Sequence, residues 1–189
     1  MEETQQRKAE ETQKRKVKAV ARKRRAYSEF LPLGEALGGY IFVCNNGTIL
    51  DCLRRNIFGL PDRFGESVRA IRPGTPVFLY NYSTRLLHGI FEAVSFGGMN
   101  IDPEAWPHPE IPGRSFYPAQ VRVRCRMACP PLNRAVFRSL VGHSAANRYH
   151  QELSVSQALM LLETFQYLHW YCVTLAQQMA TSAFYYWHV

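Results

Sequence analysis

The sequence predicts an α+β fold in which flanking helices pack on a small curved mixed sheet or partly open barrel. Three observations lead to this prediction. Two β-rich runs, residues 76–82 and 86–94, flank a short polar connection, as in a hairpin. Residues 119–127 alternate strictly between apolar and polar side chains, as a half-buried strand does. Apolar residues at helical spacing follow Ser154, and strands and helices do not alternate regularly along the chain.

The length of 189 residues fits one domain of ordinary size with an appendage. Hydrophobic residues make up 47% of the chain, which excludes disorder throughout. The formal charge of +8 is unevenly placed, because residues 1–25 hold ten Lys and Arg against four Glu. The remaining chain is nearly neutral, so its bulk charge does not indicate a nucleic-acid partner.

Charge and composition divide the chain into four parts. Residues 1–26 are a basic arm, either helical or disordered, and residues 27–35 are a linker. Residues 36–166 are the folded domain, and residues 167–189 are an uncharged, aromatic-rich tail. Basic runs in the arm are typical of nuclear targeting or phosphate binding, whereas the alternative is a solvated helix with internal ion pairs. These residues are Lys14, Arg15, Lys16, Arg22, Lys23, Arg24 and Arg25.

The N-terminal residues lack an apolar signal-peptide region, and five Cys is an odd, low count. We therefore expect an intracellular protein with reduced thiols, in the nucleus or the cytoplasm. Residues 164–189 carry no charge, but polar side chains interrupt them too often for a membrane span.

The first half is predicted to begin with a strand over residues 38–44 and a turn at residues 45–47. Thr48 is expected to cap a short helix that ends at residues 58–61. Residues 68–71 read as another strand, closed by a turn at residues 72–75. Both runs of the following hairpin are apolar on both faces, which predicts a central pair of strands. Gly89 indicates a bulge or a close backbone approach.

The second half contains a long loop, residues 97–114, with four prolines; loops of this length are often functional. In the alternating strand, Val121, Val123, Cys125 and Met127 are predicted to face the core, and Gln120 to face outward with the neighbouring arginines. Residues 133–141 are a helix candidate. Ser154 is expected to cap a longer helix that continues through residue 179.

Motifs for catalysis are missing from the sequence, which lacks a Walker A loop, a dinucleotide fingerprint, a nucleophile elbow and HExxH. We therefore expect no enzyme and no cofactor. Cys125, Cys129, His143 and His150 resemble a zinc finger, but six residues between the two His exceed the usual spacing. The thiols are interpreted as core residues, and no metal site is predicted.

Two sets of side chains are candidates for binding. Arg122, Arg124 and Arg126 form a row that can meet phosphates or carboxylates, or else lie on a wet sheet face beside Glu partners. Aromatic side chains over a curved sheet can stack a base, or else fill the core. The aromatic candidates are Tyr40, Tyr80, Tyr82 and Trp106.

Several short motifs follow one another in a characteristic order: residues 38–45, 58–61, 77–80, 87–93, 118–121 and 131–134. On these motifs, residues 36–165 resemble the plant DCD (development and cell death) domain. Arg134 stands where the family usually has Glu. The motif residues are Phe58, Gly59, Leu60, Pro61, Phe78, Leu79, Tyr80, Pro118, Ala119, Gln120, Val121, Pro131 and Leu132.

The resemblance implies a plant protein tied to stress response, hormone signalling and programmed cell death, in which the domain mediates protein interaction without catalysis. The hairpin is similar in shape to that of PUA-like folds, which include readers of modified bases. The alternative function is therefore RNA or modified-base binding, aided by the basic arm. Expected partners are proteins, with nucleic acid as the alternative and a second copy of the chain through the tail.

Overall fold

The computed structural model describes residues 36–141 and 151–186. The basic arm, the linker up to residue 35, His143 and His150 lie outside the described residues. The elements are β1 (Leu37–Cys44), α2 (Ile49–Arg55), β2 (Ile57–Leu60), the 3-10 helix η1 (Asp62–Phe64), α3 (Gly65–Arg69), β3 (Pro76–Asn81), β4 (Leu86–Ala93), β5 (Gly98–Met99), β6 (Ala119–Cys125), β7 (Leu132–Asn133), α4 (Arg134–Val141), β8 (Glu152–Ser154) and α5 (Val155–Tyr186).

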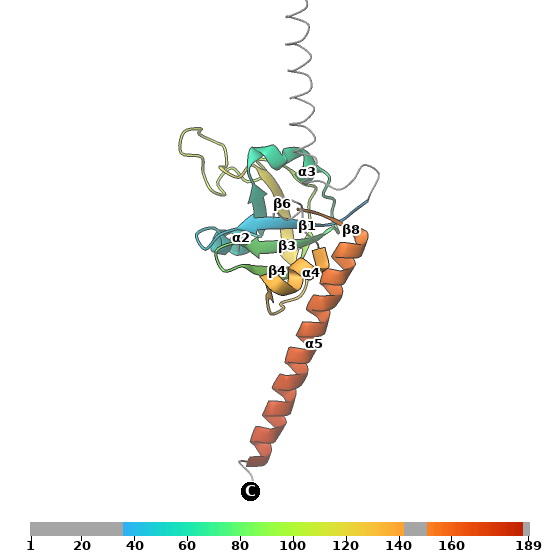
Figure 1. Ribbon diagram of the computed structural model, residues 1–189. Helices are drawn as coiled ribbons and strands as arrows, with labels where there is room; N and C mark the ends of the chain where they lie inside the picture. The colour runs from blue at the N-terminus through green and yellow to red at the C-terminus, as the bar shows by residue number, and fades with distance from the viewer. Residues whose placement is uncertain (1–35, 142–150, 187–189) are drawn as a thin grey trace, which may run out of the picture.

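The strands form one curled mixed sheet in the order β2-β6-β4-β3-β1-β8, with β5 paired to β6 and β7 paired to β4 (Figure 1). β1 and β3 run parallel, and the hairpin partners β3 and β4 run antiparallel. The predicted α+β class with a curved mixed sheet is confirmed. The hairpin lies at the centre of the sheet, as its two apolar faces predicted.

A hydrophobic core lies on each face of the sheet, because successive residues of a strand point to opposite faces. Tyr40 and Phe42 of β1 pack with Phe58 in the first core. Ile41 packs on the other face with Phe78, in the second core, which α4 and α5 cover. The two cores explain why strands β1, β3 and β4 read as continuous apolar runs.

The start of α5 follows the sequence prediction. The Ser154 hydroxyl accepts a hydrogen bond from the Gln157 backbone N–H, and the Gln157 side chain accepts one from the Ser154 N–H. Phe165 stacks on Phe78 with ring centroids 5.9 Å apart. A Cβ at Gly89 would lie 3.0 Å from both rings, so the expected close approach at this glycine is confirmed.

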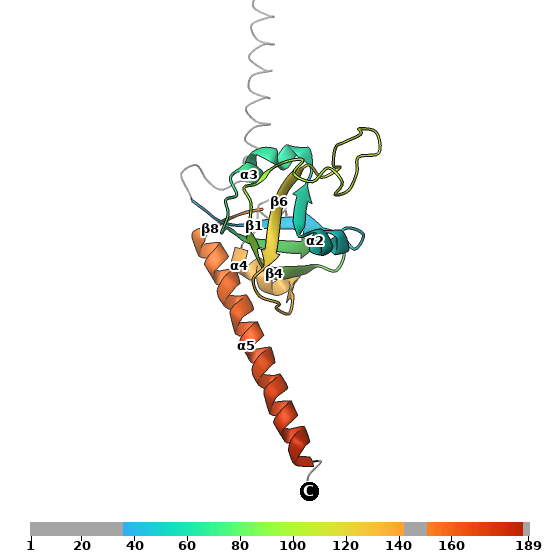
Figure 2. The same cartoon turned by 180° about the vertical axis from the view of Figure 1, so that it is seen from behind.

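The later part of α5 extends away from the sheet, and both views show it as a long projecting helix (Figures 1 and 2). The expected continuation of this helix into the tail is thus confirmed. Within the described ranges, no helix combines the length and the apolarity that crossing a membrane requires.

Three local predictions were wrong. Val68 lies in helix α3 rather than in a strand, because an apolar run of four residues does not by itself distinguish the two. Residues 58–61 do not end α2: the helix ends at Arg55, with Asn56 in the left-handed conformation as its C-cap, and the following residues form β2, which pairs with β6. The Thr48 hydroxyl does not cap α2, since it accepts a hydrogen bond from the Asn45 N–H instead.

Candidate functional site

A pocket of about 220 Å³ opens where the end of β1 meets α2, the β2–η1 segment and the loop before β6. Its wall includes four aromatic side chains from distant parts of the chain: Phe64, Tyr82, Trp106 and Tyr117. Asn45 and Thr48 add polar groups. The pocket therefore combines flat apolar surfaces with hydrogen-bonding groups, as small-molecule and base sites do.

The aromatic wall depends on a glycine in the motif of residues 58–61. Trp106 and Tyr117 meet edge to face, with ring centroids 5.6 Å apart and planes at 81°. A Cβ at Gly59 would lie 2.8 Å from both the Trp106 ring and the Tyr117 carbonyl. Only glycine lets the loop approach β2 this closely, so Gly59 positions the indole ring in the wall.

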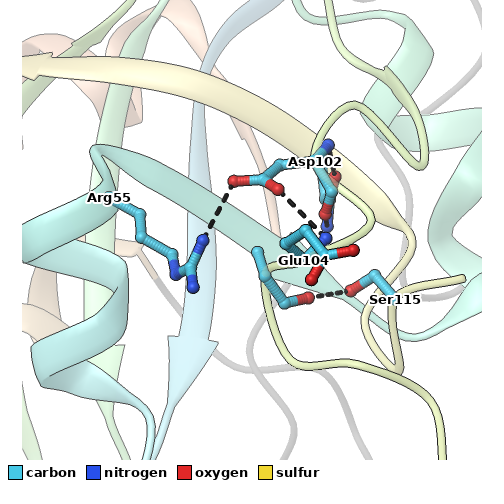
Figure 3. A network of polar contacts seen from close by, with 6 residues as sticks. Arg55, Asp102, Glu104 and Ser115 are labelled. Carbon is cyan, nitrogen blue, oxygen red and sulfur yellow. Dashed lines mark hydrogen bonds and ion pairs between the residues drawn. The ribbon is translucent and has the colours of Figure 1, made fainter. Parts of the chain in front are cut away.

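A network of polar contacts holds the loop that carries Trp106 (Figure 3). The Asp102 carboxylate lies 3.4 Å from the Arg55 guanidinium on α2 and accepts a hydrogen bond of 3.1 Å from the Glu104 N–H. The Ser115 hydroxyl donates to the Ala105 carbonyl, one residue before Trp106. The loop is thereby tied to α2 at one point and to itself at another.

Gln120 of β6 fastens the same loop to the sheet. Its side chain accepts a hydrogen bond from the Asp102 N–H at 2.8 Å and donates one to the Asp102 carbonyl at 3.2 Å. Gln120 is fully buried, so its predicted outward orientation was wrong. The physical reason is that the loop covers this face of β6 and needs a partner for its backbone.

The far part of the loop is also fixed. The Asn100 side chain donates to the Gly113 carbonyl and accepts from the Ser115 N–H, at 2.9 and 2.8 Å. Arg114 pairs with Asp62 of η1 at 2.9 Å. The long loop singled out from the sequence is therefore an ordered part of the site.

The two thiols in the pocket wall are unreactive by environment. Burial raises the pKa of Cys44 to about 12, and burial together with the neighbouring Cys44 and Asp51 raises the pKa of Cys52 to about 12. Both stay protonated near neutral pH, which makes them poor nucleophiles and poor metal ligands. They contribute apolar surface to the pocket.

The charge of the pocket wall has one sign. Arg63 is the one charged side chain among its described lining residues. The guanidinium carbon lies 4.7 Å from the centre of the Phe64 ring, so the ring stabilises the cation by a cation–π interaction. A ligand that is neutral or anionic suits this wall better than a cation does.

The sequence-predicted aromatic candidates separate in the structure. Tyr40 and Tyr80 are buried in the two cores, so their binding role was wrong. Tyr82 and Trp106 both line the pocket. Sequence reasoning missed Tyr117 and Arg63 as site residues; Tyr117 adjoins the motif at Pro118, which was the available signal.

The arginine row lies outside the pocket wall. Arg124 and Arg126 both pair with Glu92 of β4, at 2.9 and 3.0 Å. Arg122 is exposed, and no ion pair joins its side chain to another described residue. The alternative of a wet sheet face with a Glu partner is the one that the structure supports for two of the three arginines.

Cys125 is exposed, so its predicted place in the core was wrong. The alternation of β6 breaks just after it, because the N–H groups of Arg126 and Met127 both donate to the Ile90 carbonyl. Among the described residues, no group of three His, Cys, Asp or Glu side chains is placed to hold a metal ion.

The sequence profile of the development and cell death domain matches residues 38–165. The chain belongs to this DCD domain family. It is 56% identical over 138 residues to the DCD domain-containing protein NRP-B of Glycine max, and 52% identical over 139 residues to the B2 protein of Daucus carota. These alignments cover 73% and 74% of this chain, and 42% and 67% of those two proteins. The chain therefore spans less than half the length of the soybean relative.

The matched region ends at Phe165, within the part of α5 that packs on the second core, so the DCD domain coincides with the curled sheet and its covering helices. A complex of the YTH domain-containing protein mmi1 with RNA has the same type of fold, with a TM-score of 0.54 at 14% identity over 73% of this chain and 88% of that one. A second YTH structure, of MmI1, gives a TM-score of 0.51 at 16% identity over 68% and 94%. The likeness shows a shared fold.

Proposed function

We propose that this DCD domain is a non-catalytic module that binds protein partners in plant stress-response and cell-death signalling. The observation that carries the proposal is the ordered loop before β6. Its backbone is fixed by hydrogen bonds from Asn100 and Gln120, yet Ile111 and Phe116 on it are 43% and 51% exposed.

An ordered apolar loop is a good binding surface for a physical reason. Loops usually lose conformational entropy when a partner fixes them, which weakens binding. Here the domain itself already fixes the loop, and the Phe116 ring also contacts the rings of Tyr117 and His108, with centroids 5.1 and 5.6 Å away. Burial of these side chains by a partner adds affinity with little ordering cost.

Capture from plant extract tests the proposal with a pair of matched variants. I111S/F116S changes two exposed side chains of the loop. L159S changes an equally exposed side chain on α5, which both views place away from the loop (Figures 1 and 2). Proteins retained by the wild type and by L159S should be lost with I111S/F116S. Equal retention by all three would contradict the proposal.

A second function, binding of single-stranded RNA, is favoured by the pocket. Its volume accommodates a base, Trp106 and Tyr117 contribute aromatic rings to its wall, and the exposed Arg63 is available to meet a phosphate. The YTH domain of mmi1, which has the same fold, is in complex with RNA. This likeness supports the second function at the level of the fold only. The basic arm would add phosphate contacts of its own.

The salt dependence of RNA binding tests this second function. Each phosphate contact to a single strand contributes about 0.7 to the slope of log affinity against log salt. R63Q should lower the affinity and reduce the slope by about 0.7, the contribution of one phosphate contact. R72Q is the control, because Arg72 is exposed and lies outside the pocket wall, so this variant should change neither the affinity nor the slope. Fluorescence anisotropy with a labelled oligonucleotide gives both quantities. Absence of binding at low salt would exclude this function.

A further inference from the structure

The outward face of β4 and β6 gathers arginines around one carboxylate. Alternate residues of β6 pack in the first core, so Arg122 and Arg124 point to the opposite face of the sheet. Glu92 of β4 lies opposite Arg124 across the strand pair, and its carboxylate is 2.9 Å from Arg124 and 3.0 Å from Arg126. Two of the three arginines therefore share a single negative charge.

These ion pairs leave much of the positive charge in contact with solvent. The side chains of Arg124 and Arg126 are 57% and 55% exposed, whereas the Glu92 side chain is 19% exposed. Arg122 is exposed too, and none of the described residues forms an ion pair with it. Because like charges on neighbouring side chains repel one another, an incoming carboxylate is attracted to this face.

Two apolar side chains lie beside Arg122 on the segment that follows β4. The Val94 N–H donates to the Arg122 carbonyl at 2.9 Å, and the Gly97 N–H donates to the Ile71 carbonyl at 3.0 Å. Although the segment is fixed at both ends, Val94 and Phe96 are 46% and 66% exposed. A partner can bury both side chains with little ordering cost. We define the arginine face as Val94, Phe96, Arg122, Arg124 and Arg126.

A groove of about 310 Å³ adjoins the arginine face and extends to α5. Glu92 and Arg126 belong to its lining, so the groove and the face meet at this ion pair. Ile90, Met127 and Leu162 give the groove an apolar wall. A cleft of this kind accepts a large apolar side chain.

Acidic side chains on the neighbouring elements do not balance the charge of the arginine face. The Gln120 side chain holds the loop with Asp102 against β6, but the Asp102 carboxylate is paired with Arg55. Glu163 of α5 is exposed, and it is not among the described residues that line the groove. The face therefore keeps an excess of positive charge next to an apolar groove.

An acidic peptide fits this combination better than a nucleic acid does. Phosphates would meet the arginines, but they would leave the aliphatic wall of the groove uncovered. Alternate side chains of an extended peptide repeat about every 6.6 Å, which is also the spacing of Arg122 and Arg124 along β6. Residues 1–25 of this chain are basic and residues 164–189 are uncharged, so neither segment supplies the carboxylates.

We propose that the arginine face binds an extended acidic segment of another protein, with carboxylates on Arg122 and Arg124 and one large apolar side chain in the groove beside Leu162. The inference rests on the proposed role of the domain in protein binding, but it uses a surface other than the exposed loop side chains Ile111 and Phe116. The two surfaces can therefore be tested separately.

Fluorescence anisotropy of the full chain with a short labelled peptide tests the inference. The peptide carries Glu at alternate positions and one Phe. R122E should weaken binding at least about tenfold, because it opposes like charges in the contact. R85E is the matched control: Arg85 is exposed in the turn before β4, and no described residue forms an ion pair with it. It should change the affinity less than about twofold, since salt screens distant charges.

Two further variants locate the contact. F96S should weaken peptide binding at least about threefold, because Phe96 loses its contact with the peptide. I111S/F116S should bind the peptide as the wild type does, whatever its effect on capture from plant extract. Thermal unfolding of R122E and F96S should match that of the wild type, because neither side chain belongs to a core.

Four outcomes would overturn the inference. One is no binding of the peptide by the wild type at low salt. The second is equal weakening by R122E and R85E, or equal binding of a peptide with Gln in place of every Glu, which would remove the specific charge contact. The third is loss of peptide binding in I111S/F116S, which would place the acidic segment on the loop. The fourth is displacement of the peptide by single-stranded RNA that itself requires Arg122, which would make a nucleic acid the occupant.

Discussion

At the scale of single residues, the adjacent glycines Gly97 and Gly98 differ in the space available for a side chain. A Cβ at Gly97 would lie 1.8 Å from the Val68 carbonyl oxygen, whereas a Cβ at Gly98 would meet only the Ile101 side chain at 3.5 Å. The Gly97 N–H also donates to the Ile71 carbonyl, which fixes the loop against α3. The close approach belongs to the tertiary fold and leaves no trace in the dipeptide Gly-Gly.

We expect G97A to destabilise the domain by about 1–3 kcal/mol, because backbone atoms must move to admit the methyl group. G98A is the matched control and should change the free energy of unfolding by less than about 1 kcal/mol. Urea denaturation of both variants measures the difference. Equal free energies of unfolding for the two variants would contradict the prediction, because the loop would then admit the methyl group at residue 97 without loss of stability.

The two pocket thiols give a prediction about reactivity. With pKa values of about 12, Cys44 and Cys52 should resist a thiolate-specific reagent at pH 8, while the exposed Cys125 and Cys172 react readily. Native labelling followed by mass spectrometry measures each site. Unfolding in guanidinium should make all the cysteines react, which is the control.

The raised pKa values also set a pH dependence. The unfolded chain loses these thiol protons near pH 9, before the folded chain does, so the free energy of unfolding should fall from about pH 9 towards pH 12. C44A/C52A should reduce that alkaline loss relative to the wild type. An unchanged pH profile in the double variant would contradict the assignment.

At the scale of elements, the N-terminal cap of α5 at Ser154 could be predicted from the sequence because its hydrogen bonds are local. Hydroxyl and amide groups three residues apart satisfy the first N–H groups of a helix in any fold. The segment of residues 68–71 was not readable, since Val68 and Ile71 reach the first core through a helical turn and a loop. Its environment, rather than its pattern, decided between strand and helix.

S154A should cost about 0.5–2 kcal/mol of domain stability, because α5 loses its N-terminal cap. The Gln157 side chain also holds the Val141 carbonyl at 2.8 Å, so the cap connects α5 to the end of α4. S139A, which removes an exposed hydroxyl bonded only to its own helix, is the control and should lie within about 0.5 kcal/mol of the wild type. Thermal or urea unfolding gives both values.

At the scale of the whole molecule, the first part of α5 should contribute to the stability of the DCD domain, whereas the later part of the helix should not. Leu161 and Phe165 are buried, whereas residues 170–177 are largely exposed. A chain that ends at residue 169 should therefore unfold at nearly the wild-type temperature. A chain that ends at residue 159 loses both core side chains and should fail to fold, since each such deletion costs ~2–5 kcal/mol. Circular dichroism distinguishes the two truncations.

The sequence by itself determined the fold class, the central hairpin, the family and the capped helix. Each of these depends on local patterns: alternation, apolar runs on both faces, cap residues and short motifs in order. Trp106 was also predicted as a binding residue from the sequence, but only as one of four aromatic candidates that the sequence did not distinguish.

The tertiary structure alone decided which aromatic residues form a site and which fill the cores. Tyr40 and Tyr82 both belong to runs predicted as strands, yet Tyr40 lies inside β1 and is buried, whereas Tyr82 lies in the turn just after β3 and is exposed. The pocket arises where the loop carrying Trp106 returns over Gly59, a contact between residues far apart in the chain. Such contacts are set by the packing of whole elements, which no short stretch of sequence encodes.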